Sequence, residues 1–112
     1  VAGVSEADML VAVQEVQGLG GGLAVVADGV VLASLALPLG GLLSEQPLEE
    51  VQRQLEALHE AARSLGVKKE HDPFMTLAFL SLPVIPKLKL TDRGLVDVEL
   101  FQLVPVSLAT GE

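Results

Sequence analysis

The two histidines, His59 and His71, are the first residues to consider as metal ligands or proton carriers. A metal site normally takes three or four ligands from His, Cys, Asp or Glu at characteristic spacings. The sequence has no cysteine and no His-x-His or His-Glu-x-x-His motif. His59 falls at the edge of a predicted helix and His71 in a charged loop. We therefore expect two structural histidines, no metal site and no cofactor held by this chain.

Ser5 and Ser44 are candidate nucleophiles, and the three glycines at 20–22 are a candidate phosphate loop. The sequence lacks a Gly-x-Ser-x-Gly elbow, and each serine precedes a predicted helix, where its hydroxyl would be an N-cap. The glycines lie between a predicted helix and a predicted strand. A phosphate loop needs the opposite order, strand before glycines and helix after them. A tight backbone connection is the simpler interpretation.

The remaining charged residues are typical of a solvated surface. The acids on the second predicted helix are Glu49, Glu50, Glu56 and Glu60. Arg53 and Arg63 can pair with acids three or four residues away, for a few tenths of a kcal/mol each. Asp92, Arg93 and Gly94 predict a turn with a local ion pair rather than an acid–base dyad. No catalytic residue is predicted in this chain.

Length and composition exclude several classes of protein. The chain has 112 residues, half of them hydrophobic, a net charge of −8, three phenylalanines and neither tryptophan nor tyrosine. This length suffices for one domain, so residues 1–112 are predicted to be a single domain. The apolar fraction excludes disorder. The acidic balance argues against a nucleic-acid partner, which requires clustered Lys and Arg.

No segment is typical of a membrane-spanning helix. The longest uncharged run covers residues 29–44 and is interrupted by Pro38 and by Gly40-Gly41. A spanning helix needs roughly 18–20 apolar residues. A secretory signal is also not apparent. We therefore expect no membrane partner and a cytoplasmic location.

The N-terminal half predicts a helix followed by a hairpin. Residues 1–4 resemble the end of a strand, and Ser5 caps a helix over about 6–17. Two strands, 23–27 and 30–37, flank Asp28-Gly29, a dipeptide that favours a type I′ turn. The second strand is apolar at nearly every position, which indicates that both its faces are covered.

The C-terminal half predicts two more helices and further strands. Ser44 is predicted to cap a helix with Pro47 in its first turn and Gly66 as its stop. Its apolar stripe consists of Leu48, Val51, Leu55, Leu58, Ala62 and Leu65. Residues 74–80 fit a helix or a buried strand, and the Asp72-Pro73 start favours the helix. An extended segment through Pro83 and Pro86, a strand over 88–91 and a last strand within 96–106 follow.

These elements predict an α+β fold, in which a small, mostly antiparallel sheet with a hairpin from Leu23 to Leu37 is packed by two or three helices. Half of the charged residues lie between Glu45 and Asp72. The other segments have little polar surface. We expect this apolar excess to contact a missing domain or another subunit, and the chain to be a fragment that self-associates.

Two long stretches carry a resemblance to a known family. Residues 71–98 read HDPFMTLAFLSLPVIPKLKLTDRGLVDV, and residues 20–29 read GGGLAVVADG. Both resemble the C-terminal region of bacterial adenine deaminases, as do residues 31–35 and 37–51. The resemblance covers nearly the whole chain in the same order. Its departures, near Leu39, Gly40 and Leu43, are conservative.

The resemblance implies membership of the amidohydrolase superfamily, whose enzymes of this type hydrolyse adenine to hypoxanthine and ammonia in purine salvage. It also implies a manganese or iron pair, held by a β/α barrel that precedes the matched region. The barrel would be the partner of this chain, and adenine would bind only in the full enzyme. No catalytic residue carries over, because the ligand motifs are not in this sequence.

One segment is a candidate for contact with that barrel. Residues 74–86 are an apolar run with its path fixed by prolines, and it could form a wall of the active site or an interdomain contact. Its candidate residues are Phe74, Met75, Phe79, Pro83 and Pro86. A core or interdomain role is the simpler alternative. A stand-alone, non-catalytic α+β interaction or ligand-binding module is the other function that the sequence leaves open.

Overall fold

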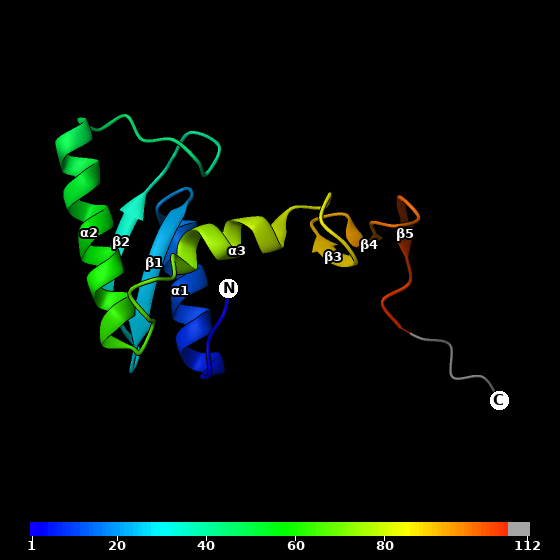
Figure 1. The fold of residues 1–112 in the computed structure, drawn as a ribbon, viewed down its shortest axis with the longest axis horizontal. Helices are drawn as coiled ribbons and strands as arrows, with labels where there is room; N and C mark the ends of the chain where they lie inside the picture. The colour runs from blue at the N-terminus through cyan, green and yellow to red at the C-terminus, as the bar shows by residue number, and fades with distance from the viewer. Residues whose placement is uncertain (108–112) are drawn as a thin grey trace. The chain divides into compact units, whose positions relative to one another are not determined.

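The computed structural model describes residues 1–107 (Figure 1). The elements in chain order are α1 (Glu6–Gly18), β1 (Gly22–Ala27), β2 (Val30–Ala36), α2 (Leu48–Ser64), α3 (Pro73–Ser81), β3 (Leu88–Thr91), β4 (Gly94–Asp97) and β5 (Gln102–Val104). They divide into a first compact unit, Val1–Phe74, and a second that begins at Met75. The α+β class is confirmed, with two small antiparallel sheets in place of one. The single domain predicted for residues 1–112 stays a prediction.

The first unit is built on the β1–β2 hairpin. The two strands are antiparallel, with Gly22 opposite Ala36 and Ala27 opposite Val30. Asp28 and Gly29 form the turn with φ of 52° and 73°, as type I′ geometry requires. The predicted hairpin is therefore confirmed nearly to the residue.

The glycines before β1 form a tight connection, as predicted. Gly22 has a φ of +150°, and a Cβ atom at this position would overlap the Leu35 carbonyl oxygen. Only glycine allows β1 to start so close to β2.

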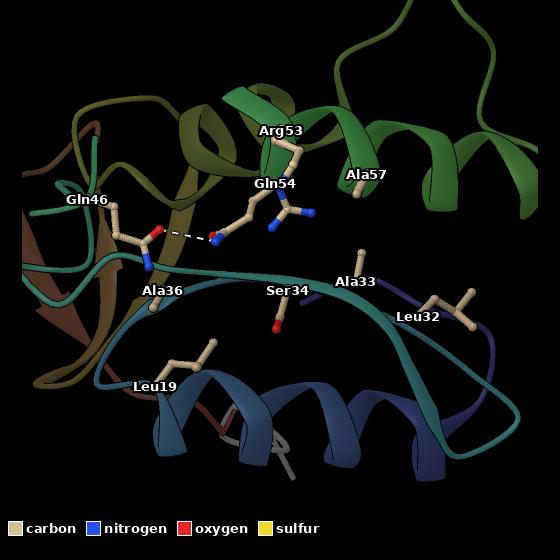
Figure 2. Close-up of a pocket in the computed structure, with 9 residues that line it drawn as sticks. All are labelled: Leu19, Leu32, Ala33, Ser34, Ala36, Gln46, Arg53, Gln54 and Ala57. Carbon is tan, nitrogen blue, oxygen red and sulfur yellow. Dashed lines mark hydrogen bonds between the residues drawn. The ribbon is translucent and has the colours of Figure 1, made fainter. Parts of the chain in front are cut away.

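Helices cover both faces of this hairpin. In Figure 2, α2 lies on one side of the strands and α1 on the other. α1 begins as predicted, because the Ser5 hydroxyl accepts a hydrogen bond from the Asp8 amide at 3.3 Å. The first unit is therefore a three-layer arrangement in which a sheet of two strands lies between two helices.

The core of the first unit lies between α2 and the hairpin. It consists of Val25, Leu35, Leu58 and Ala62, and Leu58 has an exposed fraction of 0%. The centre of the predicted α2 stripe is therefore buried. Its two ends, Leu48 and Leu65, are exposed. Gly66 ends α2 as predicted, since its N–H donates to the Arg63 carbonyl.

Two details of the sequence prediction are wrong in this unit. Ser44 does not cap α2: the N-cap is Pro47, and the Ser44 hydroxyl accepts a bond from the Gln46 amide at 3.1 Å. The reason is that a residue before proline avoids helical angles, so the helix cannot start before Pro47. Residues 1–4 are not a strand, because they pair with none of residues 1–107.

In the second unit, β3, β4 and β5 form an antiparallel sheet in that order. The sequence predicted one last strand within 96–106, whereas the structure has β4 and β5 joined by a turn. Asp97 accepts a hydrogen bond from the Leu100 amide at 2.9 Å, and Phe101 has a φ of 52°. This turn reverses the chain where the prediction continued a strand.

α3 resolves the choice between helix and strand for residues 74–80. It starts at Pro73, and the Asp72 carboxylate accepts a bond from the Phe74 amide at 3.0 Å. No helix within residues 1–107 has both the length and the apolar character needed to cross a bilayer.

Candidate functional site

The two histidines lie in different surroundings. His59 on α2 is half-buried, with its Nε2 at 3.8 Å from Asp72 Oδ2 and its ring edge-on to Phe74 at 5.3 Å. His71 is exposed, and its backbone amide donates to the Lys68 carbonyl. Within residues 1–107 no cluster of three or more His, Cys, Asp or Glu side chains could hold a metal ion.

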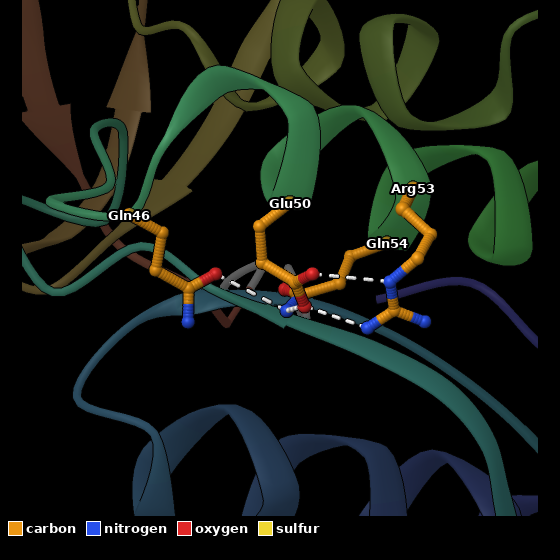
Figure 3. Close-up of polar contacts among 4 residues, drawn as sticks. All are labelled: Gln46, Glu50, Arg53 and Gln54. Carbon is orange, nitrogen blue, oxygen red and sulfur yellow. Dashed lines mark hydrogen bonds and ion pairs between the residues drawn. The ribbon is translucent and has the colours of Figure 1, made fainter.

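A polar cluster lies at the first turns of α2 (Figure 3). Arg53 donates two hydrogen bonds to the Glu50 carboxylate, at 2.6 and 3.1 Å. Gln54 donates to the same carboxylate at 2.6 Å and to the Gln46 side-chain oxygen at 3.1 Å. The ion pair between Arg53 and Glu50 is one of the pairings predicted for Arg53. Arg63 is exposed and forms no ion pair with a residue in 1–107.

The cluster changes the acidity of Glu50. The hydrogen bonds from Arg53 and then Gln54 favour its charged form and lower its pKa from the ordinary value of 4.5 to about 2. The same contact raises the pKa of Arg53. Glu50 is therefore a permanent anion near neutral pH, unsuited to general acid–base catalysis.

A cleft lies beside this cluster, along β2. Its volume is about 400 Å³, and Figure 2 shows the side chains that line it. These are Leu19, Leu32, Ala33, Ser34, Ala36, Gln46, Arg53, Gln54 and Ala57. We call it the β2 cleft. Of these residues only Arg53 is charged, so the cleft has the chemistry of a binding surface and holds no acid–base pair.

The residues predicted to contact the barrel do not share one environment. Phe74 packs against the core of the first unit and against His59. The second unit carries Met75 and Phe79, 55% and 54% exposed, and Pro83 and Pro86, also exposed. Phe74 thus packs in the first unit, whereas the other four are exposed in the second.

Asp92, Arg93 and Gly94 form the predicted turn between β3 and β4. The Thr91 hydroxyl closes it by donating to the Gly94 carbonyl at 2.9 Å and accepting from the Arg93 amide at 3.2 Å. The predicted ion pair between Asp92 and Arg93 is absent from this turn. The threonine bonds fix the loop and leave both charges to solvent.

A second cleft, of about 420 Å³, lies within the second unit. Pro83, Val84 and Val96 line it together with Phe101, which is 81% exposed. The sequence reasoning missed both clefts. Most of their lining side chains are neutral or apolar, and the charged ones are Arg53 in the β2 cleft and Asp92 and Arg93 in the second cleft. No sequence motif marks either cleft.

The fold and the clefts together define a class of protein. The chain is a small α+β domain with two shallow clefts and exposed apolar side chains, and residues 1–107 contain no cluster suited to metal binding.

The chain belongs to the adenine deaminase C-terminal domain family, whose profile matches residues 1–102. It is 64% identical over 108 residues to adenine deaminase 2 of Carboxydothermus hydrogenoformans, covering 96% of this chain and 19% of that protein. It is 57% identical to the adenine deaminase of Desulfatibacillum aliphaticivorans, covering 93% of this chain and 18% of the relative. It is 58% identical to the adenine deaminase of Oleidesulfovibrio alaskensis, covering 95% of this chain and 18% of that relative. The chain thus spans about a fifth of these relatives.

Proposed function

We propose that this chain is the C-terminal domain of a cytoplasmic adenine deaminase, which hydrolyses adenine to hypoxanthine and ammonia in purine salvage. The observation that carries the proposal is the family match over residues 1–102, together with relatives that are each called adenine deaminase. The role of the domain is to pack on the catalytic barrel and support it.

The metal of such an enzyme belongs outside this chain. A manganese or iron pair needs several His, Asp or Glu ligands, and residues 1–107 do not bring three such groups together. The residues present therefore do not fit a metal pair. In this proposal the barrel holds the metal and the adenine, and the present chain contributes a surface that packs on the barrel.

The exposed apolar side chains of the second unit support the packing role. Met75, Phe79, Leu80, Leu82 and Val84 are each between 41% and 65% exposed. Burying one large apolar side chain contributes about 1.5–3 kcal/mol. Contact with the barrel would therefore stabilise both partners considerably.

Among these residues, Met75 and Phe79, with Pro83 and Pro86, are proposed to form an interdomain contact or a wall of the active site. The two roles differ in their effect on catalysis. In the longer enzyme, Phe79→Ala should raise the Michaelis constant for adenine if it forms a wall. It should lower only the melting temperature if the contact is interdomain. Leu48→Ala, at an exposed leucine on α2, is the matched control.

The proposed function is tested by an ammonia-release assay on two proteins. The longer polypeptide that contains this chain, loaded with Mn²⁺ or Fe²⁺, should release ammonia from adenine, and the 112-residue chain treated identically should not. Turnover by the 112-residue chain would contradict the proposal that the metal and the adenine bind outside this chain. No turnover by the metal-loaded longer polypeptide would overturn the activity and leave a non-catalytic module.

A further inference from the structure

We propose that the outer edge of β2 binds an extended strand of the parent polypeptide from outside residues 1–112. The strand would occupy the β2 cleft and continue the β1–β2 sheet. This inference rests on the proposed function, in which the chain is one part of a longer adenine deaminase.

The backbone of β2 has one paired edge and one open edge. Within residues 1–107, β2 pairs with β1 alone. The Leu37 amide donates to the Gly21 carbonyl at 2.8 Å, and the Leu35 carbonyl oxygen faces Gly22. Backbone groups of alternate residues point to opposite edges of a strand. Those of Ser34 and Ala36 therefore point away from β1, and both residues line the β2 cleft.

The space beside this edge suits a strand. The helices α1 and α2 cover the two faces of the hairpin (Figure 2), and the β2 cleft lies beside β2. Four of the nine side chains that line the β2 cleft are small, namely Ala33, Ser34, Ala36 and Ala57, and the larger ones include Leu32, Arg53 and Gln54. An added strand would gain main-chain hydrogen bonds from the edge and place alternate side chains toward each helix.

The sequence of β2 is that of an interior strand. Edge strands are usually protected by a charged residue, a proline, an inward-pointing charge or a β-bulge. The seven residues of β2, VVLASLA, include no charge and no proline, and a register shift opposite Val25 and Val26 is the one such feature of this strand. A nearly continuous apolar run is typical of a strand with neighbours on both sides and helices on both faces. β2 therefore has the composition of a strand whose second neighbour lies in another part of the protein.

The parent chain is the occupant that the observations favour over a second copy of this chain. About four fifths of each relative lies outside the matched segment, which supplies ample polypeptide. A second copy would bring together two molecules that each carry a net charge of −8. This charge opposes self-pairing.

Amide hydrogen exchange in the unmodified proteins tests the proposal. In the longer polypeptide, the Ser34 and Ala36 amides should exchange at least about 100-fold more slowly than in the 112-residue chain. The Leu35 and Leu37 amides face β1, so they are the internal control and should be protected in both proteins. Equal, fast exchange of Ser34 and Ala36 in both proteins would overturn the proposal.

Two proline substitutions, made one at a time, provide a second measurement. Ser34→Pro removes an outward N–H, which an open edge tolerates, so the 112-residue chain should keep its far-UV spectrum. In the longer polypeptide the same change should abolish the slow exchange at Ala36. Leu35→Pro removes an N–H that faces β1 and should unfold the hairpin in both. Retained slow exchange at Ala36 in the longer Ser34→Pro protein would contradict strand addition.

The outcomes separate this inference from the proposed function. Ammonia release by the longer polypeptide with fast exchange at Ser34 and Ala36 would overturn the strand and leave the function intact. Slow exchange without ammonia release would support the strand and overturn the function. Concentration-dependent protection in the 112-residue chain, with a dimer mass by light scattering, would assign the edge to a second copy and overturn the inference.

Discussion

The Asp8 carboxylate on α1 accepts a hydrogen bond from the backbone N–H of Gly29 at 2.7 Å. Its other oxygen accepts from the Asp28 amide at 3.3 Å. One side chain in the first turn of a helix therefore binds two successive amides of the hairpin turn. These bonds join the outer layer of the first unit to the tip of its sheet.

Replacing Asp8 with alanine should destabilise the chain by about 1 kcal/mol, because two turn amides lose a charged acceptor. Glu6→Ala is the control, since Glu6 lies in the same helical turn and its loss removes only a helix-dipole interaction of a few tenths of a kcal/mol. Urea unfolding followed by far-UV circular dichroism measures both. Equal effects of the two changes would show that the turn contact contributes nothing.

Arg53→Met should raise the pKa of Glu50 from about 2 toward 4.5, because the guanidinium is the first cause of the lowered value. The folded pKa lies below the unfolded one. The stabilisation by this pair is therefore fully present above about pH 4.5 and is lost as the pH falls toward 2. A carbon-13 NMR titration of the glutamate side chains measures the shift. Arg63→Met should leave Glu50 unchanged, and an unchanged Glu50 in Arg53→Met would contradict the assignment.

Two glycine substitutions should have opposite signs. Gly22→Ala forces a methyl group onto the Leu35 carbonyl at a φ of +150°, so we expect a loss of about 2–3 kcal/mol or more. Gly18→Ala lies at the end of α1 with no atom within 4 Å of the new methyl group, so it should stabilise the chain by up to about 1 kcal/mol. Urea midpoints give both values. A tolerated Gly22→Ala would contradict the close approach of Gly22 to the Leu35 carbonyl oxygen.

Leu58→Ala should be among the most harmful changes in α2. Leu58 has an exposed fraction of 0%, and truncating a buried leucine costs about 2–5 kcal/mol. Leu48→Ala, at a leucine that is 76% exposed on the same helix, should cost less than about 0.5 kcal/mol. Thermal unfolding separates the two. Similar melting temperatures would place the core of the first unit elsewhere.

Elements with local signals could be predicted from the sequence. Ser5 starts α1 by bonding a backbone amide three residues on, and Asp28-Gly29 fixes the hairpin through its own dihedral angles. Asp72 likewise starts α3. Each signal acts within a few residues, so neighbouring sequence is sufficient. Ser44 had the same appearance, but Pro47 imposed a later helix start.

Features that depend on distant segments could not be predicted. The turn before β5 places Phe101 at a positive φ, which side chains other than Asn, Asp and Gly rarely adopt. The β2 cleft exists because α1 and α2 lie on opposite faces of the hairpin, and no residue in it carries a recognisable motif. The separation of Phe74 from Met75 into two units follows from packing and has no signal in the sequence.

The bonds from Asp8 to the hairpin turn have a consequence for the order of folding. They span 20 and 21 residues, and both acceptor contacts require Asp28 and Gly29 to hold positive φ at once. A hairpin with a two-residue turn forms in microseconds and at little entropic cost. The contact from Asp8 closes a longer loop and needs a turn that has already formed. We expect the hairpin to form first and α1 to dock onto it afterwards, so that substitutions at Asp8 accelerate unfolding and leave the folding rate nearly unchanged.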